Sequence, residues 1–205
     1  MVGAIIQRLT EEGEADDRDG ALSFISLAGS IIGSLRRYYD STANETAKAL
    51  DTVPPSLQQK AADAIAKGLT KCESPIEQAL LPWLVTQDYQ FFRYSPTVLF
   101  AGEHCLYVPR TLAIVPQLPI GRYRVDFALA ASLGGAIRFV IVECDGKEFH
   151  DGVDNTFRDA ERDATIMKNE RVLAIVRIPG VEIMRDAQAA AKIAARAVLD
   201  AWAKK

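Results

Sequence analysis

The sequence predicts an α/β protein in which a mixed β-sheet carries helices on both faces. Hydrophobic periodicity after residue 70 follows the order helix, strands, helix, strand, helix, which fits such a sheet. The chain has 205 residues, of which 49% are hydrophobic and 25% are charged. These values are typical of a soluble globular protein with one domain, or with one domain and an appendage. Carboxylates also interrupt two runs that otherwise have the pattern of buried strands.

Residues 1–70 are predicted to form a helical N-terminal extension ahead of a main domain at 71–205. The first 20 residues hold six acidic residues and two arginines, a net charge of −4, and lack a sustained apolar pattern. They are therefore expected to be a polar lead-in, partly helical or disordered. Apolar residues then recur at helical spacing in three segments. The predicted helices of the extension are 21–39, 43–50 and 55–69.

The main domain begins with a helix whose start is marked by a capping box. Ser74, Pro75 and Glu77 occupy the N-cap, first and third positions of this helix. Ser132-Leu133-Gly134-Gly135 predicts the turn of a hairpin. The last helix is predicted to be continuous and Ala-rich, with Ile193 on its apolar face. The predicted strands are 91–94, 111–115, 122–130, 136–145 and 172–178, and the later helices are 156–169 and 182–202.

Three carboxylates occupy positions where the flanking pattern indicates buried strands. Asp126 lies in the run 123–129, and Glu143 and Asp145 end the apolar run 137–142. An ionised carboxylate in such a place is costly unless it is paired or bound to a metal. Glu143 and Asp145 share a face because side chains alternate along a strand. If the strand with Asp126 pairs beside them, the acids converge at one end of a sheet and form a site for a hard divalent cation, Mg²⁺ or Mn²⁺.

These carboxylates belong to an ordered set of motifs along the last two thirds of the chain. The set comprises Ser74-Pro75-Ile76-Glu77, the segment from Gln117 to Phe127, Glu143-Cys144-Asp145-Gly146 with His150, Arg158-Asp159, Arg162-Asp163 and a strand ending at Arg177. It resembles the PD-(D/E)XK nuclease superfamily, whose fold is called restriction-endonuclease-like. The chain is most similar to the branch related to the very-short-patch-repair endonuclease, which is rich in uncharacterised bacterial and phage proteins.

Two positions depart from the pattern of that superfamily. Val125 replaces the proline of the family name, and Asp145 replaces the lysine that follows Glu143 by two residues. The second departure is common in this branch, but it leaves the role of the positive charge unassigned. Lys147 can fill that role from the next turn.

The resemblance implies a restriction-endonuclease-like fold and an enzyme that hydrolyses phosphodiester bonds in DNA with Mg²⁺ or Mn²⁺. Asp126 and Glu143 are the predicted metal ligands, and the resemblance adds the helix carboxylate Glu77, which would act through a water. Asp145 is expected to be a further ligand or to orient Lys147. These five residues, with His150, form the predicted catalytic set.

Basic residues near these acids are predicted to serve the scissile phosphate. Lys147, His150 or Arg162 would offset developing charge or move a proton, a task to which imidazole is suited near neutral pH. The resemblance implies that Arg162 and Asp159 face the site, where a guanidinium can hold a phosphate through two hydrogen bonds. Lys147, Arg158 and Arg162 are therefore the predicted DNA-binding residues.

Each strand carboxylate also has a simpler explanation. Asp126 can pair with Arg122 or Arg124 at a strand end. Glu143 and Asp145 can be solvated carboxylates where a strand leaves the sheet.

The other candidates have such explanations too. Glu77 can serve only the capping box, by reaching back to the Ser74 amide. His150 can be an ordinary surface histidine, and Arg158 and Arg162 can belong to a solvated helix face held by ion pairs.

The resemblance leaves other functions open. The leading alternative is a catalytically degenerate nuclease-like domain that binds DNA or a protein partner without cleaving. A third possibility is an enzyme that uses the same acids on a nucleotide or RNA substrate. The N-terminal helices are a candidate surface for a homodimer or a protein partner.

The net charge, the cysteines and the apolar segments indicate which partners and which cell compartment to expect. The net charge of −3 means that DNA binding must come from local placement of arginine and lysine. Three cysteines without CxxC spacing indicate a reducing cytoplasm and no disulfide framework, and they match no usual zinc pattern. The sequence shows no secretory signal, and the apolar stretch 21–35 is too short to cross a bilayer. A cytoplasmic protein without membrane association is therefore expected.

Overall fold

The computed structural model describes the backbone of residues 40–89, 96–103, 111–133, 135–145 and 153–204. Side chains are described for the same residues except 133 and 153–159. The chain divides into two compact units, Met1–Asp40 and Ser41–Lys205, and the fold below belongs to the second. The predicted helix at 21–39 and the predicted strand at 91–94 lie outside the described residues. Within the described residues, no helix has the length and apolar character needed to cross a membrane.

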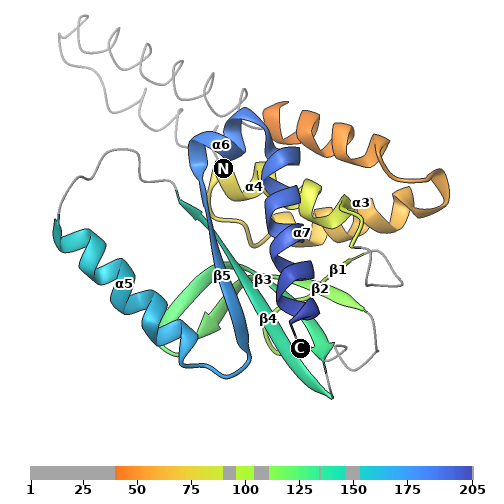
Figure 1. Cartoon of the computed structure of the whole chain (residues 1–205). Helices are drawn as coiled ribbons and strands as arrows, with labels where there is room; N and C mark the ends of the chain where they lie inside the picture. Colours follow the sequence, from red (N-terminus) through yellow and green to blue (C-terminus); the bar gives the residue numbers. More distant parts are fainter. Residues whose placement is uncertain (1–39, 90–95, 104–110, 134, 146–152, 205) are drawn as a thin grey trace, which may run out of the picture. The chain divides into compact units, whose positions relative to one another are not determined.

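A mixed sheet forms the centre of the second unit, as the sequence predicts. In the described part of the chain its five strands follow the order β1-β2-β3-β4-β5 (Figure 1). The strands are β1 Thr97–Val98, β2 Leu112–Ile120, β3 Tyr123–Leu133, β4 Ala136–Asp145 and β5 Val172–Pro179. Strands β2, β3 and β4 pair in antiparallel fashion, whereas β1 pairs with β2 and β4 with β5 in parallel. The parallel pairing of β5 follows from the helical crossover that precedes it.

Helices cover both faces of this sheet. Helix α5 lies against one face, and α4 and α7 lie against the other (Figure 1). The helices of this unit include α3 Pro55–Leu69, α4 Pro75–Thr86, α5 Val153–Met167, α6 Gly180–Arg185 and α7 Ala187–Ala203. Two apolar cores result: a larger one between the sheet and α4, α6 and α7, and a smaller one under Ile166 of α5.

The larger core extends into residues that the sequence analysis placed in the N-terminal extension. Residues 41–51 are helical, and α3 packs against α4 and β1. Ala49 and Ile65 are buried in the same core as Leu80 and Leu84 of α4. From residue 41 onward the extension therefore shares its apolar core with the main domain.

Helix α4 begins where the capping box predicts. The Ser74 hydroxyl accepts a hydrogen bond from the Glu77 amide at 3.2 Å, and Pro75 occupies the first helical position. This start fixes Glu77 at the N-terminal end of α4, beside the sheet.

The predicted continuous helix at 182–202 is wrong, because it is two helices. Helix α6 follows β5 directly, and the backbone leaves helical geometry at Asp186, where φ is −157°. The Asp186 carboxylate then accepts from the Ala189 amide at 2.9 Å and caps α7. The second helix turns a face of small residues such as Ala190 and Ala194 to the core, whereas Ile193, predicted on the apolar face, is 47% exposed.

Candidate active site at the end of strands β3 and β4

Side-chain alternation changes phase on β2 and β3 next to the predicted carboxylates. The core beneath α5 receives Ala113, Val115, Leu118 and Ile120 from β2 and Tyr123, Val125, Ala128 and Ala130 from β3. A regular strand presents every second residue to one face, so each of these strands skips one residue. The skipped positions include Gln117 and Asp126, which lie opposite each other between the paired rungs Pro116↔Phe127 and Leu118↔Val125. The break leaves the Asp126 side chain outside the regular alternation.

Asp126 is fixed by the backbone of the neighbouring strand. The antiparallel ladder between β3 and β4 runs as far as the pair Phe127↔Val142. Two residues farther along β4, the Cys144 amide donates to Oδ2 of Asp126 at 2.7 Å. The Asp126 side chain thus continues the ladder in place of a backbone carbonyl, and its carboxylate is held through one oxygen at the point where the two strands part.

Glu143 is buried beside Asp126 and is held by an arginine from α5. Only 3% of its surface is exposed. Nη2 of Arg162 lies 2.9 Å and 3.0 Å from the two Glu143 carboxylate oxygens, and it also donates to the Arg124 carbonyl at 2.9 Å. On the other side, Arg177 of β5 is the register partner of Glu143. Arg162 therefore contacts Glu143, and its partner here is a carboxylate instead of the phosphate that the resemblance implies.

Burial and a neighbouring carboxylate raise the cost of ionising each of the two strand carboxylates. Burial raises the pKa of Glu143 from its ordinary 4.5 to about 7; the Asp126 charge adds to this rise, and Arg162 and Arg177 oppose it. Burial also raises the pKa of Asp126, the Cys144 amide opposes that change, and the Glu77 charge adds to it. Arg162 and Arg177 lower both pKa values, but they do not fully offset the cost of burying two carboxylates.

Glu77 on α4 is the third carboxylate of the site, and like Glu143 it is buried, with 5% of its surface exposed. Its Oε1 accepts from the Ser74 hydroxyl at 2.7 Å, and its Oε2 accepts from the Glu73 amide at 3.0 Å. Glu77 thus makes capping contacts, although it reaches the Glu73 amide and the Ser74 side chain instead of the Ser74 amide. Oε2 also accepts from Nε2 of Gln117 at 2.7 Å, a contact across forty positions of sequence. This contact ties α4 to β2 beside Asp126.

The ion pairs of Arg122 and Arg124 exclude the simpler explanation for Asp126. Arg122 pairs with Glu161 at 3.0 Å, and Arg124 pairs with Glu73. Neither arginine is therefore the partner of Asp126 that the simpler explanation required.

The charged side chains of the site carry excess negative charge. They are Glu77, Asp126, Glu143 and Asp163 on one side and Arg162 and Arg177 on the other. Arg177 holds Asp163 with two hydrogen bonds, of 3.2 Å from Nε and 2.6 Å from Nη2. Formally, four carboxylates face two guanidinium groups, which leaves two negative charges without a cation among these six.

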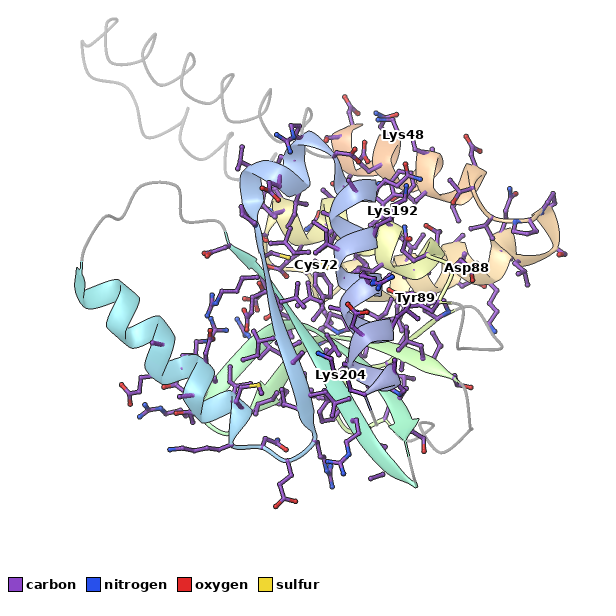
Figure 2. The ribbon with its side chains drawn as sticks, viewed as in Figure 1. Lys48, Cys72, Asp88, Tyr89, Lys192 and Lys204 are labelled. Carbon is purple, nitrogen blue, oxygen red and sulfur yellow. The ribbon has the colours of Figure 1, made fainter. Side chains whose placement is uncertain are left out.

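Two thiols respond to the same negative potential. Burial raises the pKa of Cys72 and of Cys144 well above the ordinary value of 9.0, and the charges of Glu77 and Asp126 raise both further. Figure 2 labels Cys72 among the inner side chains near the middle of the view. A thiol must lose its proton to bind a metal or attack a substrate. The raised pKa values oppose that loss, so oxygens are the favoured donors of the site.

Mg²⁺ and Mn²⁺ are the cofactors that the sequence pattern implies, and the oxygen donors fit them in part. Among the described residues, no group of three or more His, Cys, Asp or Glu side chains is arranged to hold a metal. Mg²⁺, however, often uses only one or two protein carboxylates and completes its shell with water and substrate phosphate. Asp126 and Glu143 can supply such a pair, and a divalent cation would offset the excess charge.

Three of the predicted site residues have no described side chain, and a fourth has no described role. Lys147 and His150 are outside the described residues, and Arg158 lies on α5 with its side chain undescribed. Asp145 is half-buried at the end of β4, where it is the register partner of Pro179. The predicted roles of these four residues remain predictions.

A separate cavity has no connection with these acids. Its volume is about 360 Å³, and its lining includes Glu45, Lys48, Trp83 and Asp186. Trp83 is buried, and its Nε1 donates to Glu45 at 2.8 Å. None of the site carboxylates lines this cavity.

Two members of the site, Gln117 and Arg177, were not predicted from the sequence to have side chains with a role.

Comparisons of the chain with protein-family models, with curated proteins and with solved structures found no match. The residues and their geometry are therefore the basis for a functional proposal.

Proposed function

We propose that this chain is a restriction-endonuclease-like enzyme that hydrolyses phosphodiester bonds in DNA with Mg²⁺ or Mn²⁺. One observation carries the proposal: Asp126 and Glu143 lie on adjacent strands just beyond the last rung of their ladder, one half-buried and the other buried, and both have raised pKa values. Such a pair costs stability in a protein without a cation, and a perturbed carboxylate pair at a sheet end suggests a functional site.

In this proposal Asp126 and Glu143 hold the metal, and Glu77 contributes from α4. The metal would supply an activated water and would stabilise charge on the scissile phosphate. The Cys144 amide orients Asp126, and burial beneath α5 keeps Glu143 from bulk water. Asp145 is a further ligand or orients Lys147, as the sequence pattern implies.

Arg162 connects the metal site with the substrate in the same proposal. Its side chain is 24% exposed, so it borders solvent while it contacts Glu143. A metal on Glu143 would compete with this contact, and a released guanidinium can take a phosphate with the geometry it uses for a carboxylate. Lys147, His150 and Arg158 are the other proposed groups for phosphate binding or proton transfer.

A second candidate is a relative that binds DNA or a protein partner without cleaving. The contact between Arg162 and Glu143 favours it, because a guanidinium occupies both oxygens of a proposed metal ligand. In such a protein the arginine would permanently replace the metal. The two candidates differ in a simple way, since only the nuclease binds a divalent cation at Asp126 and Glu143.

Plasmid nicking tests the proposed activity. Supercoiled DNA is incubated with the protein in Mg²⁺, in Mn²⁺ and in EDTA, and RNA and single-stranded DNA serve as comparison substrates. We expect nicking that EDTA abolishes and that Asp126→Ala and Glu143→Gln each abolish while the protein stays folded. Glu161→Gln is the matched control, because it neutralises an exposed carboxylate on α5. Wild-type cleavage rates in either site variant would contradict the assignment of the site. Cleavage of RNA but not of DNA would mean that the substrate is RNA.

A further inference from the structure

Gln117 has a backbone conformation that its residue type does not favour. Its φ is +54°, and among the described residues it alone has positive φ without being glycine. The left-handed region places Cβ against the carbonyl oxygen and is usually occupied by glycine or asparagine. It also falls inside strand β2, where the ladder continues on both sides of Gln117. A conformation of this kind persists when contacts outside the backbone hold it.

The contact that holds Gln117 is its hydrogen bond to Glu77. Regular alternation after Ala113 and Val115 would direct residue 117 toward the α5 side of the sheet. Glu77 belongs to α4, which covers the opposite face. The left-handed turn brings the Gln117 amide to that face, where Nε2 lies 2.7 Å from Oε2 of Glu77.

The donors around Glu77 are of one chemical kind. The Ser74 hydroxyl, the Glu73 backbone amide and the Gln117 side-chain amide are all neutral. Neutral donors stabilise and orient a buried carboxylate without cancelling its charge. Gln117 lies opposite Asp126, between the rungs Pro116↔Phe127 and Leu118↔Val125, so its hydrogen bond holds the Glu77 carboxylate beside the Asp126 site.

We infer that Gln117 is a positioning residue that aims the charged Glu77 carboxylate at the Asp126 site and thereby strengthens divalent-cation binding. The inference rests on the proposed metal site and assigns it a component on β2. An arginine or lysine in place of Gln117 would pair with Glu77 and weaken the attraction for a cation. A neutral amide retains that attraction, at the expense of a strained backbone.

A double-mutant cycle with Mn²⁺ as the probe tests the inference. Calorimetric titration with MnCl₂ compares the wild type, Gln117→Leu, Glu77→Gln and the double variant. We expect Gln117→Leu and Glu77→Gln each to weaken Mn²⁺ binding by about tenfold, the equivalent of about 1.4 kcal/mol. The double variant should lose little more than either single variant, because Gln117 acts through Glu77. Gln58→Leu is the control: its amide donates to the Leu50 and Val53 carbonyls, so its loss should leave Mn²⁺ affinity unchanged.

A second pair of variants separates the amide from the backbone. Gln117→Gly and Gln117→Ala both remove the amide, but only glycine adopts positive φ readily. The glycine variant should therefore melt at the higher temperature, while both bind Mn²⁺ about equally weakly. If Gln117→Leu does not fold, Gln117→Gly takes its place in the cycle.

The outcomes distinguish the inference from the proposed function. A wild type that binds no Mn²⁺ overturns the proposed metal site and the role of Gln117 with it. Wild-type Mn²⁺ affinity in the Gln117 variants, when Asp126→Ala abolishes binding, overturns the role of Gln117 alone. Additive losses in the cycle would also overturn it, because Gln117 would then act independently of Glu77.

Discussion

At the scale of single residues, Glu143 should make stability depend on pH. A carboxylate whose folded-state pKa is raised favours folding most when protonated, so its contribution is lost as pH rises from about 4.5 to about 7. The full loss is on the order of 3 kcal/mol, at about 1.4 kcal/mol per pKa unit. Denaturant unfolding in EDTA between pH 4.5 and 8 measures it. Glu143→Gln should lose less stability than the wild type over this range, and identical pH profiles would contradict the assignment.

Arg162 is the second residue with a distinct expectation. Arg162→Ala removes the hydrogen bonds that the buried Glu143 accepts, so the metal-free protein should lose about 1–3 kcal/mol at pH 8. If Arg162 also contacts a phosphate, the salt slope of DNA binding should fall by about 0.9. Arg171→Ala is the control, since Arg171 is exposed in the connection before β5. Binding isotherms at several salt concentrations that show equal effects for the two variants would reduce Arg162 to a structural ion pair.

Residue chemistry explains which parts of the site the sequence could predict. Asp126 and Glu143 stand out because acids inside apolar strands are rare and costly. Gln117 does not stand out, because an amide beside a proline is ordinary and a left-handed φ leaves no mark on the sequence. Arg177 was named only as a strand end, because its contact with Asp163 depends on how α5 is placed against β5.

At the scale of elements, the Asp186 cap should stabilise the last helix. Asp186→Ala removes the acceptor for the Ala189 amide and should cost about 1 kcal/mol of unfolding free energy. Asp200→Ala on the same helix removes only an exposed pair with Arg196 and should cost less than about 0.5 kcal/mol. Thermal melts of the two variants give the comparison. A greater loss from Asp200→Ala would mean that the α6–α7 break does not depend on this cap.

The limits of an element were predicted correctly where the residues at its two ends mark a start and a stop, and incorrectly where they do not. Residues 55–69 and 136–145 have the predicted limits, because proline, turn residues and apolar runs mark both ends. The break between α6 and α7 was missed, since alanine has a high helix propensity and one aspartate inside such a run is a weak stop signal. The change of phase on β2 and β3 could not be predicted, because it depends on the pairing of both strands.

At the scale of the whole molecule, the first 20 residues should be dispensable for activity because of their charge. They carry a net charge of −4, and the rest of the chain carries +1. A variant lacking residues 1–20 should keep its activity and bind DNA slightly more tightly at low salt, because a repelling segment is gone. Nicking assays and binding isotherms at low and high salt measure both effects. A truncated protein that folds but cannot cleave would place this segment in the site.

The Mn²⁺ dependence of unfolding tests the central claim most directly, because it reports a metal site whether or not the protein cleaves DNA. A cation that binds only the folded state should stabilise the wild type by about 2.7 kcal/mol at 100 times its Kd. Asp126→Ala and Glu143→Gln should lose this stabilisation, and Glu161→Gln should keep it. An unfolding free energy of the wild type that Mn²⁺ leaves unchanged, or an equal gain in Asp126→Ala, would contradict a metal site built on Asp126 and Glu143.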